Sequence, residues 1–195
     1  MDKYVGQIVR RLDDLGMAEN TLLVFTSDHG HLFGQHGMTA KGPFHYEDLL
    51  RVPFIARCPG VIPAGEYCDS LISLVDLPTT FLSWAEIEAP KSMVGKDQMP
   101  VLSKDVSSVR DEVVVENRQE YTTVHVKTLV TERFKLTVYL NQSYGELFDL
   151  LEDPQELRNL WNCKANQGEK EALINRLLFA EMEKEPIWMP RISGA

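Results

Sequence analysis

The stretch "LLVFTSDHGHLFGQHG", residues 22–37, joins a short apolar run to an Asp-His pair and a loop rich in glycine and histidine. An almost wholly apolar run of this length predicts a strand covered on both faces, as in a parallel sheet between helices. Ligands of open α/β sheets gather at the carboxyl ends of the strands. Asp28 and His29 lie at such an end, and a carboxylate with an imidazole is a common ligand set for a divalent cation.

The geometry of a strand restricts how this pair can act. Neighbouring side chains of a regular strand point to opposite faces, so Asp28 and His29 can share one ion only if the backbone turns. Gly30 permits such a turn. The alternative is that Asp28 caps the turn and His29 packs beneath it. These residues alone leave both interpretations open.

The composition excludes several classes of protein. The chain has 195 residues, of which 44% are hydrophobic, and a net charge of -9. A surface with this charge argues against a nucleic-acid partner, because phosphate backbones repel it. No apolar stretch approaches the ~20 residues of a membrane helix, and no signal-peptide pattern follows Met1, so we expect a soluble protein without a membrane partner and leave its localisation open. The three cysteines form neither an even framework nor a metal-ligand spacing.

The elements around the opening stretch predict an α/β layered core. Apolar residues recur at three- and four-residue spacings over residues 4–15, which indicates an amphipathic helix that Gly16 ends. The apolar run at 52–59 predicts a second strand, and residues 73–87 predict a helix with Pro78 in its first turn. We assign residues 1–105 to this core, with residues 88–105 as a connecting surface loop.

The remainder, residues 106–195, has a different pattern. Residues 110–117, 121–131 and 133–140 alternate in polarity and are rich in β-branched side chains, which is typical of strands. Because they are short and closely spaced, we expect an antiparallel meander. Residues 169–185 predict a closing helix. The second domain is therefore expected to be an antiparallel sheet with a helix.

An ordered set of motifs resembles the sulfatase family of the alkaline-phosphatase superfamily. The residues that carry the resemblance are Ser27-Asp28-His29-Gly30, Gly34-Gln35-His36-Gly37, Lys41-Gly42, Tyr46-Glu47, Arg51-Val52-Pro53 and the segment "ELFDLLEDPQELRNL" at 146–160. The resemblance implies part of an alkaline-phosphatase-like α/β/α core, followed by a smaller C-terminal α+β lobe with an antiparallel sheet. It also implies a metal-dependent sulfuric ester hydrolase that acts on a sulfate ester.

The resemblance implies roles for four residues. Asp28 and His29 match metal ligands of the family, for which we expect calcium, with manganese or zinc as alternatives because an imidazole suits them. Lys41 matches the lysine that contacts a sulfate oxygen and the formylglycine nucleophile, and its alternative is a surface lysine in a loop. His36 is expected to orient the site through a hydrogen bond, or else to order the loop itself.

Other polar residues of the motif region are expected to be structural. His31 and His45 match no ligand position, and we interpret both as solvated loop histidines. Glu47 and Arg51 are expected to form an ion pair behind the site.

Two parts of a complete sulfatase site are missing from the sequence. No cysteine begins the C-x-(P/A)-x-R motif that carries the family's nucleophile, and Cys58 and Cys163 are near-misses. The first acidic pair of metal ligands is also absent. We therefore expect the C-terminal portion of a sulfatase, inactive alone, with an exposed sheet edge that permits self-association. The alternatives are a phosphodiester or phosphonate monoester hydrolase of the same superfamily, or a non-catalytic remnant that acts as a binding module.

Overall fold

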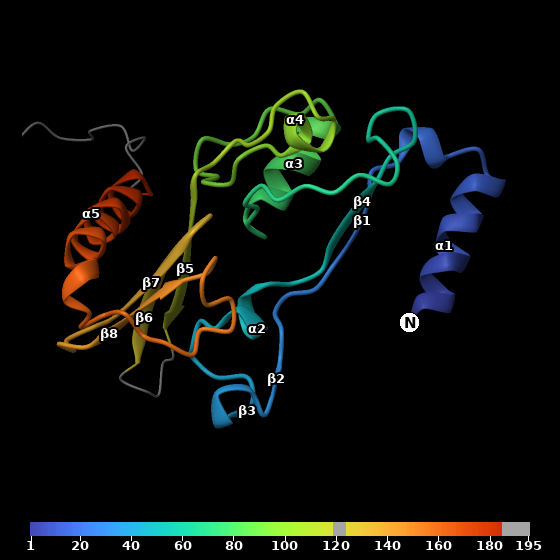
Figure 1. The fold of residues 1–195 in the computed structure, drawn as a ribbon. Coiled ribbons are helices and arrows are strands. Elements are labelled where there is room, and N and C mark those ends of the chain that lie inside the picture. Colours follow the sequence, from blue (N-terminus) through green and yellow to red (C-terminus); the bar gives the residue numbers. More distant parts are fainter. Residues whose placement is uncertain (119–123, 185–195) are drawn as a thin grey trace, which may run out of the picture. The chain divides into compact units, whose positions relative to one another are not determined.

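The computed structural model describes residues 1–118 and 124–184. Within it the chain forms two compact units, each built from several segments, and Figure 1 labels their helices and strands. The first unit consists of residues 1–28, 53–89 and 95–109. The second consists of residues 29–52, 90–94 and the described residues from 110 to 184. The predicted domain boundary between residues 105 and 106 stays a prediction.

The first unit contains the predicted helices and strands of the N-terminal region. Its elements are α1 (Asp2–Asp14), the 3-10 turn η1 (Ala18–Asn20), β1 (Leu23–Thr26), β4 (Phe54–Arg57), α3 (Asp76–Trp84) and α4 (Met99–Leu102). The helical pattern at 4–15 and the helix with Pro78 in its first turn are both confirmed. No residue of α1 is buried among the described residues.

The pairing of β1 differs from the prediction. β1 and β4 form an antiparallel two-stranded sheet, with Leu23 opposite Arg57 and Thr26 opposite Phe54. The residues of β1 are half-buried rather than covered on both faces. The expectation that this strand is covered on both faces, as in a parallel sheet, is therefore not met by β1 in the described structure. An apolar run reports that a strand is shielded from water, but it carries no information about the direction of its neighbour.

The segment 88–105 is also more ordered than a connecting surface loop. It contains α4, and it supplies Gln98, which is only 2% exposed. The buried carboxylate of Asp76 accepts hydrogen bonds from Ser73 N, Lys96 N and Gln98 Nε2 at 2.8–2.9 Å. A buried carboxylate requires such donors, so Asp76 holds this segment against α3.

The second unit is built on the predicted antiparallel meander. Its four strands are β5 (Glu112–Arg118), β6 (His125–Thr131), β7 (Phe134–Tyr139) and β8 (Gly145–Asp149), in the order β5-β6-β7-β8. All three pairings are antiparallel. The strand expectation at 121–131 is confirmed from His125 on, and its first three residues lie outside the described part of the chain.

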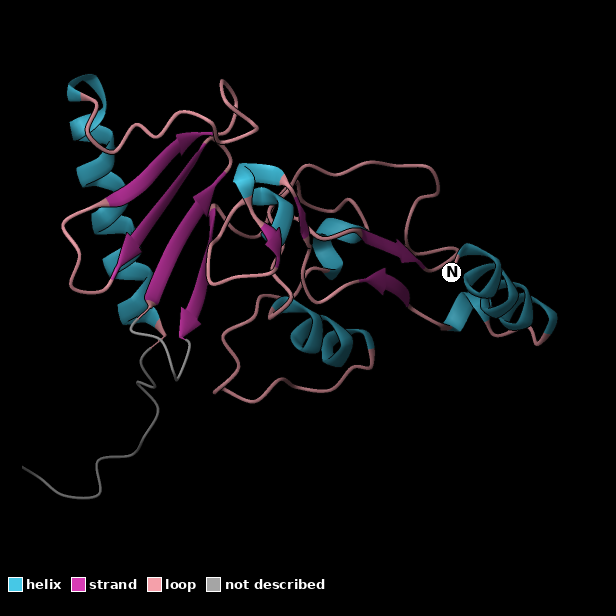
Figure 2. Ribbon diagram, turned by 90° about the horizontal axis from the view of Figure 1, so that it is seen from below, coloured by secondary structure: helices cyan, strands magenta, loops and turns pink. Residues whose placement is uncertain are grey.

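Helix α5 (Gln167–Glu183) covers one face of this sheet, as Figure 2 shows. The core between them is made of leucines from the sheet, the following loop and the helix: Leu129, Leu136, Leu147, Leu160, Leu173 and Leu177. The predicted closing helix is thus confirmed within the described residues. None of the helices in the described ranges is both long enough and apolar enough to cross a membrane.

The opposite face of the sheet is buried but polar. Thr128, Lys135 and Thr137 are each 1% exposed or less. Thr128 lies directly opposite Thr137 in the β6–β7 ladder, while their neighbours Leu129 and Leu136 pair on the α5 face. Because successive strand residues point to opposite faces, the register of the β6–β7 pairing determines which side chains lie on each face of the sheet.

The segment that covers the polar face carries the motif region. It contains β2 (Leu32–Phe33), the 3-10 turn η2 (Gln35–Gly37), β3 (Thr39–Ala40) and α2 (Glu47–Leu50), and the unit is completed by η3 (Lys164–Asn166). β2 and β3 form a short antiparallel hairpin. α2 lies on the side of the sheet away from α5 (Figure 1).

Gly30 joins the start of this segment to α2 by close backbone approach. Its N–H donates to Leu49 O at 2.8 Å, and a Cβ at this position would lie 1.8 Å from Asp48 O. Its φ is not in the left-handed region, in contrast to those of Gly34 and Gly37. The sequence interpretation assigned Gly30 to a backbone turn. The structure instead requires glycine there because no side chain fits against α2.

Leu177 and its neighbour Leu178 provide a matched test of the core. Leu177 is 6% exposed and Leu178 is 54% exposed. We expect Leu177→Ala to lower the free energy of unfolding by about 2–5 kcal/mol, because it leaves a cavity against the sheet. Leu178→Ala should change it by no more than about 0.5 kcal/mol. Urea denaturation followed by circular dichroism measures both, and equal losses would contradict this assignment of the core.

Gly30→Ala is expected to destabilise the second unit by about 1–3 kcal/mol, because the clash is with backbone atoms that cannot rotate away. Gly168→Ala is the control: a Cβ added there, in α5, would meet nothing within 4 Å, so the same change should be neutral or stabilising by up to about 1 kcal/mol. Thermal unfolding of the two variants gives the comparison. A neutral Gly30→Ala would show that α2 is not packed against Gly30.

Candidate active site

The exposed side chains of His29 and Lys41 meet at the start of the second unit. His29 Nδ1 lies 2.7 Å from Gly30 O, and His29 Nε2 lies 3.1 Å from Lys41 Nζ. A carbonyl oxygen only accepts, so Nδ1 carries the proton and donates to it. Nε2 of the neutral ring then presents its lone pair to the lysine ammonium. Two of the four predicted site residues are therefore brought into contact, although 12 positions separate them.

Asp28 and His29 are consecutive, but the division between the two units falls between them. Asp28 is exposed. Among the described residues, no group of three or more His, Cys, Asp or Glu side chains could hold a metal ion. The donor types of Asp28 and His29 suit a divalent cation, but zinc takes about four ligands and calcium about six to eight. These two residues thus fit part of a metal site, and their role as ligands stays a prediction.

His36 lies in a strained turn and stacks on Tyr46. Its backbone has φ 52° and ψ 23°, a left-handed conformation between Gly34 at φ 113° and Gly37 at φ 70°. The His36 and Tyr46 ring centroids are 3.8 Å apart with an interplanar angle of 12°. A non-glycine residue in this conformation is held there by its surroundings, and such residues cluster at functional sites. The structure therefore fixes the His36 ring on Tyr46.

Tyr46 is anchored in turn to the sheet. Its hydroxyl donates to Glu146 Oε1 at 2.9 Å, and the hydroxyl of Tyr139 donates to Glu146 Oε2 at 2.8 Å. Burial, reinforced by the Glu146 carboxylate, raises the pKa of both tyrosines above the usual value. Both tyrosine hydroxyls therefore stay protonated and donate to Glu146 near neutral pH. The hydrogen bonds that hold Tyr46 beneath His36 are unchanged in that range.

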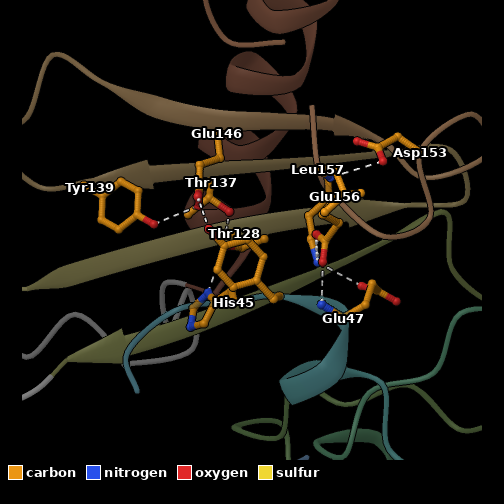
Figure 3. A network of polar contacts seen from close by, with 11 residues as sticks. His45, Glu47, Thr128, Thr137, Tyr139, Glu146, Asp153, Glu156 and Leu157 are labelled. Carbon is orange, nitrogen blue, oxygen red and sulfur yellow. Dashed lines mark hydrogen bonds and ion pairs between the residues drawn. The ribbon is translucent and has the colours of Figure 1, made fainter. Parts of the chain in front are cut away.

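His45 is buried, and the expectation that it is a solvated loop histidine was wrong. It is 5% exposed, and its Nδ1 lies 2.8 Å from Thr128 Oγ1, which in turn lies 2.8 Å from Thr137 Oγ1 (Figure 3). Burial, together with the nearby Lys135 charge, lowers the pKa of His45 to about 4. The neutral imidazole is thus a structural link between the motif segment and strands β6 and β7. His31, in contrast, is exposed, as expected.

A buried ion cluster links α2 to the turn that follows β8. Lys135 Nζ pairs with Glu47 Oε1 at 3.0 Å and with the carboxylate of Glu156. The second oxygen of Glu156 accepts a hydrogen bond from Glu47 N at 2.7 Å (Figure 3). Burial raises the pKa of Glu156, although the Lys135 charge counteracts this. Glu47 therefore pairs with Lys135, and the predicted partner Arg51 is replaced.

Sequence reasoning missed Lys135 and Glu156. A lysine in an alternating strand is normally assigned to the solvent face, and only the facing acidic residue of α2 explains its burial. The motif residue Glu47 was identified, but its partner lies 88 positions away. A pairing over that separation leaves no local signal in the sequence.

A cleft of about 650 Å³ opens beside this cluster, and all its walls belong to the second unit. Three segments line it: the η2 turn at residues 35–36, α2 with its C-terminal end at residues 47–51, and the turn at residues 154–157. His36 lies in its wall. The cleft thus adjoins the motif region, and the ion cluster fixes two of its three walls relative to each other.

The two cysteines of the near-miss motifs, Cys58 and Cys163, are both removed from solvent at least in part. Cys58 is fully buried, its thiol lies 3.6 Å from Glu19 O, and burial raises its pKa. Cys163 packs against the leucine core. A buried thiol with a raised pKa is a poor nucleophile, which agrees with the rejection of the near-miss motif at Cys58.

The lowered pKa of His45 predicts a pH dependence of stability. Its folded-state value of about 4 lies below the ordinary value of 6.5, so the unfolded chain binds more protons between these values. This contribution is fully present above pH 6.5 and is lost as the pH falls toward 4, by about 3 kcal/mol in total. The raised pKa of Glu156 acts in the opposite direction. His45→Gln should remove the His45 contribution, so the free energy of unfolding of this variant, measured by urea titration, should depend less on pH between 6.5 and 4. His31→Gln should keep the pH dependence of the unaltered chain.

Comparisons with known proteins identify the relatives of this chain. A family model described as N-sulphoglucosamine sulphohydrolase, C-terminal, matches residues 34–184. An N-acetylglucosamine-6-O-sulfatase of Bacteroides thetaiotaomicron is 32% identical, over 91% of this chain and 33% of its own length. An arylsulfatase of Clostridium perfringens is 30% identical, over 94% of this chain and 38% of its own length. The chain therefore spans about a third of the length of these curated relatives.

Solved structures show the same fold. The structure of BT4656 in complex with its substrate D-glucosamine-2-N,6-O-disulfate has a TM-score of 0.87 at 25% identity, over 98% of this chain and 40% of that chain. BT1596, a 2-O GAG sulfatase, has a TM-score of 0.81 at 26% identity, over 99% of this chain and 43% of that chain. The expected alkaline-phosphatase-like fold class is confirmed. Since the family model covers most of the chain and the relatives are sulfatases, this protein belongs to the sulfatase family of the alkaline-phosphatase superfamily.

Proposed function

We propose that this chain forms the C-terminal portion of a metal-dependent sulfuric ester hydrolase, with the nucleophile supplied by a segment outside these residues. The observation that carries the proposal is the contact of 3.1 Å between Lys41 Nζ and His29 Nε2. The loop that carries both residues is anchored to the sheet where it ends, by the contact of His45 with Thr128. The names of the relatives support a sulfate ester as the substrate.

Lys41 is the proposed catalytic residue of this portion. Its ammonium group is exposed and held near His29. Negative charge grows on the oxygens of the transferred sulfuryl group, and a fixed ammonium in contact with them stabilises it. An ammonium group has three N–H donors, and one of them faces His29 Nε2, so two further donors are available for the anion.

Asp28 and His29 are the proposed ligands of the divalent ion, through a carboxylate oxygen and Nε2. When bound, such an ion supplies a positive charge that polarises the ester oxygen. Calcium is the proposed ion, with manganese or zinc as alternatives because of the imidazole. His36 is proposed to position the loop through its stack on Tyr46.

Two alternatives remain for the same chain. A phosphonate monoester hydrolase of Agrobacterium radiobacter has a TM-score of 0.83 at 25% identity, over 94% of this chain and 39% of that chain. A carboxylate-imidazole pair and a lysine suit a phosphonate ester as well as a sulfate ester. The second alternative is a non-catalytic binding module, which the missing nucleophile favours. Self-association through the β1–β4 edge is a further expectation for the isolated chain.

The isolated chain is expected to turn over no aryl sulfate. Joined to the first two thirds of the Bacteroides thetaiotaomicron N-acetylglucosamine-6-O-sulfatase, it should give a hydrolase whose kcat falls by about 10²–10³ in Lys41→Ala, the loss of one charge-stabilising group. Lys164→Ala, which changes an exposed lysine of η3, is the control.

Three results would contradict parts of this proposal. Turnover by the isolated chain that Lys41→Ala abolishes would show that the chain is complete for catalysis. Faster hydrolysis of a phosphonate ester than of a sulfate ester would favour the first alternative. Calorimetric titration of calcium, manganese and zinc into the joined protein gives an independent readout, and tight binding that survives Asp28→Ala would exclude Asp28 as a ligand.

A further inference from the structure

We propose that Ala40 is a positioning residue for Lys41 and that its left-handed backbone directs the lysine toward His29. This inference rests on the proposed function, in which Lys41 stabilises the transferred group, and it adds a residue that lies outside the sulfatase motifs. Ala40 has φ 69° and immediately precedes Lys41. It is therefore the point at which the chain turns out of the hairpin of β2 and β3 (Figure 1).

The backbone conformation of Ala40 is unfavourable for a residue with a side chain. In the left-handed region the Cβ atom crowds the following carbonyl oxygen, and glycine is the residue that usually occupies this region. Elsewhere in the same hairpin, two of the positive φ values belong to glycines, Gly34 at 113° and Gly37 at 70°. Ala40 is exposed, so its methyl group gains little from burial that could offset the strain. The strain must therefore be imposed by what holds the chain on either side of Ala40.

On its N-terminal side, Ala40 is held by the hairpin. It pairs with Leu32 in the ladder of β2 and β3, and Leu32 is only 1% exposed. The turn that joins the two strands is closed by a hydrogen bond from Gly34 N to Met38 O at 2.9 Å. The position of Ala40 is thus set by a strand pair that has a buried side chain as its anchor.

On its C-terminal side, the chain is fixed again at His45. This residue is 5% exposed, and its Nδ1 lies 2.8 Å from Thr128 Oγ1. Only residues 41–44 connect Ala40 to this anchor, and Pro43 fixes its own φ among them. Because the chain is held on both sides over so short a span, a change in the backbone of Ala40 would have to move one of the two anchors.

The contact between Lys41 and His29 follows this turn directly. Lys41 Nζ lies 3.1 Å from His29 Nε2, although the lysine is exposed. An exposed lysine loses much rotamer entropy when it is held in one position, so a backbone that already points it toward its partner lowers that cost. Strained residues of this kind occur at active sites, where they preorganise a catalytic group at the expense of stability. The strain at Ala40 thus fixes the start of the Lys41 side chain.

The test substitutes Ala40 in the 195-residue chain and in the protein joined to the first two thirds of the Bacteroides thetaiotaomicron N-acetylglucosamine-6-O-sulfatase. Ala40→Gly removes the strain and at the same time frees the backbone. It should raise the Tm of the 195-residue chain by up to about 4 °C. In the joined protein it should lower kcat for an aryl sulfate about tenfold and change KM by less than about twofold, because Lys41 acts on the charge of the transition state.

Two further variants separate the position of Lys41 from a general effect on the fold. Ala40→Asn should keep kcat within about twofold of the unaltered joined protein, because asparagine accepts the left-handed conformation without the freedom of glycine. Glu86→Gly is the matched control, because Glu86 is an exposed residue of the first unit with φ 57°. It should raise the Tm by a similar amount and leave kcat unchanged. A lower Tm in Ala40→Gly, or an unchanged kcat, would overturn the proposal.

A second measurement needs no catalysis. In ¹⁵N relaxation experiments on the unaltered 195-residue chain, the backbone amide of Lys41 should have an order parameter near about 0.85, the value of a rigid backbone. Ala40→Gly should lower it, and Ala40→Asn should keep it. An inactive joined protein would contradict the proposed function. A low order parameter in the unaltered chain, or one that Ala40→Gly does not change, would instead overturn the role of Ala40.

Discussion

Lys135 is the residue on which the second unit depends. An ammonium group that is 1% exposed is tolerated only because two carboxylates surround it, and these come from α2 and from the turn after β8. Removing one member of such a cluster leaves an uncompensated buried charge, which costs about 3–5 kcal/mol. Three segments that are far apart in the sequence are therefore held together by one charge.

The same charge specifies the register of the sheet. β7 alternates between leucine core on the α5 face and the polar row of Lys135 and Thr137 on the other. A slip of one residue would place Lys135 among the leucines and a leucine against Glu47. Purely apolar faces would tolerate such a slip better. The polar face thus gives the meander one arrangement, and that arrangement determines where the motif segment docks.

The motif segment is divided into an exposed part and an anchored part. His29 and Lys41 are exposed at the loop, whereas the returning residues His45, Tyr46 and Glu47 each bond to the sheet or to Lys135. The proposed sulfuryl transfer would need polar groups at the surface and in a fixed geometry. Anchoring the loop at His45, Tyr46 and Glu47, while His29 and Lys41 stay exposed, would meet both requirements.

The sequence by itself determined the family, the meander and the closing helix. The ordered motifs between Ser27 and Leu160 indicated the family. Alternating polarity indicated the strands of the meander, and three- and four-residue spacing indicated the helix. Both patterns are local and repeat over several residues, so they can be recognised without the fold. The motif also assigned Lys41 and His29 to one site, but their direct contact was not predicted.

Only the tertiary structure decided the direction of β4 beside β1, the burial of His45 and Lys135, and the partner of Glu47. An apolar run does not encode the direction of its neighbour. A histidine or lysine normally prefers water, and that preference is reversed only when a distant segment supplies a hydroxyl or a carboxylate in the right place. Such a pairing depends on which segments meet in the folded chain, and that is decided by the fold as a whole and not by the residues on either side.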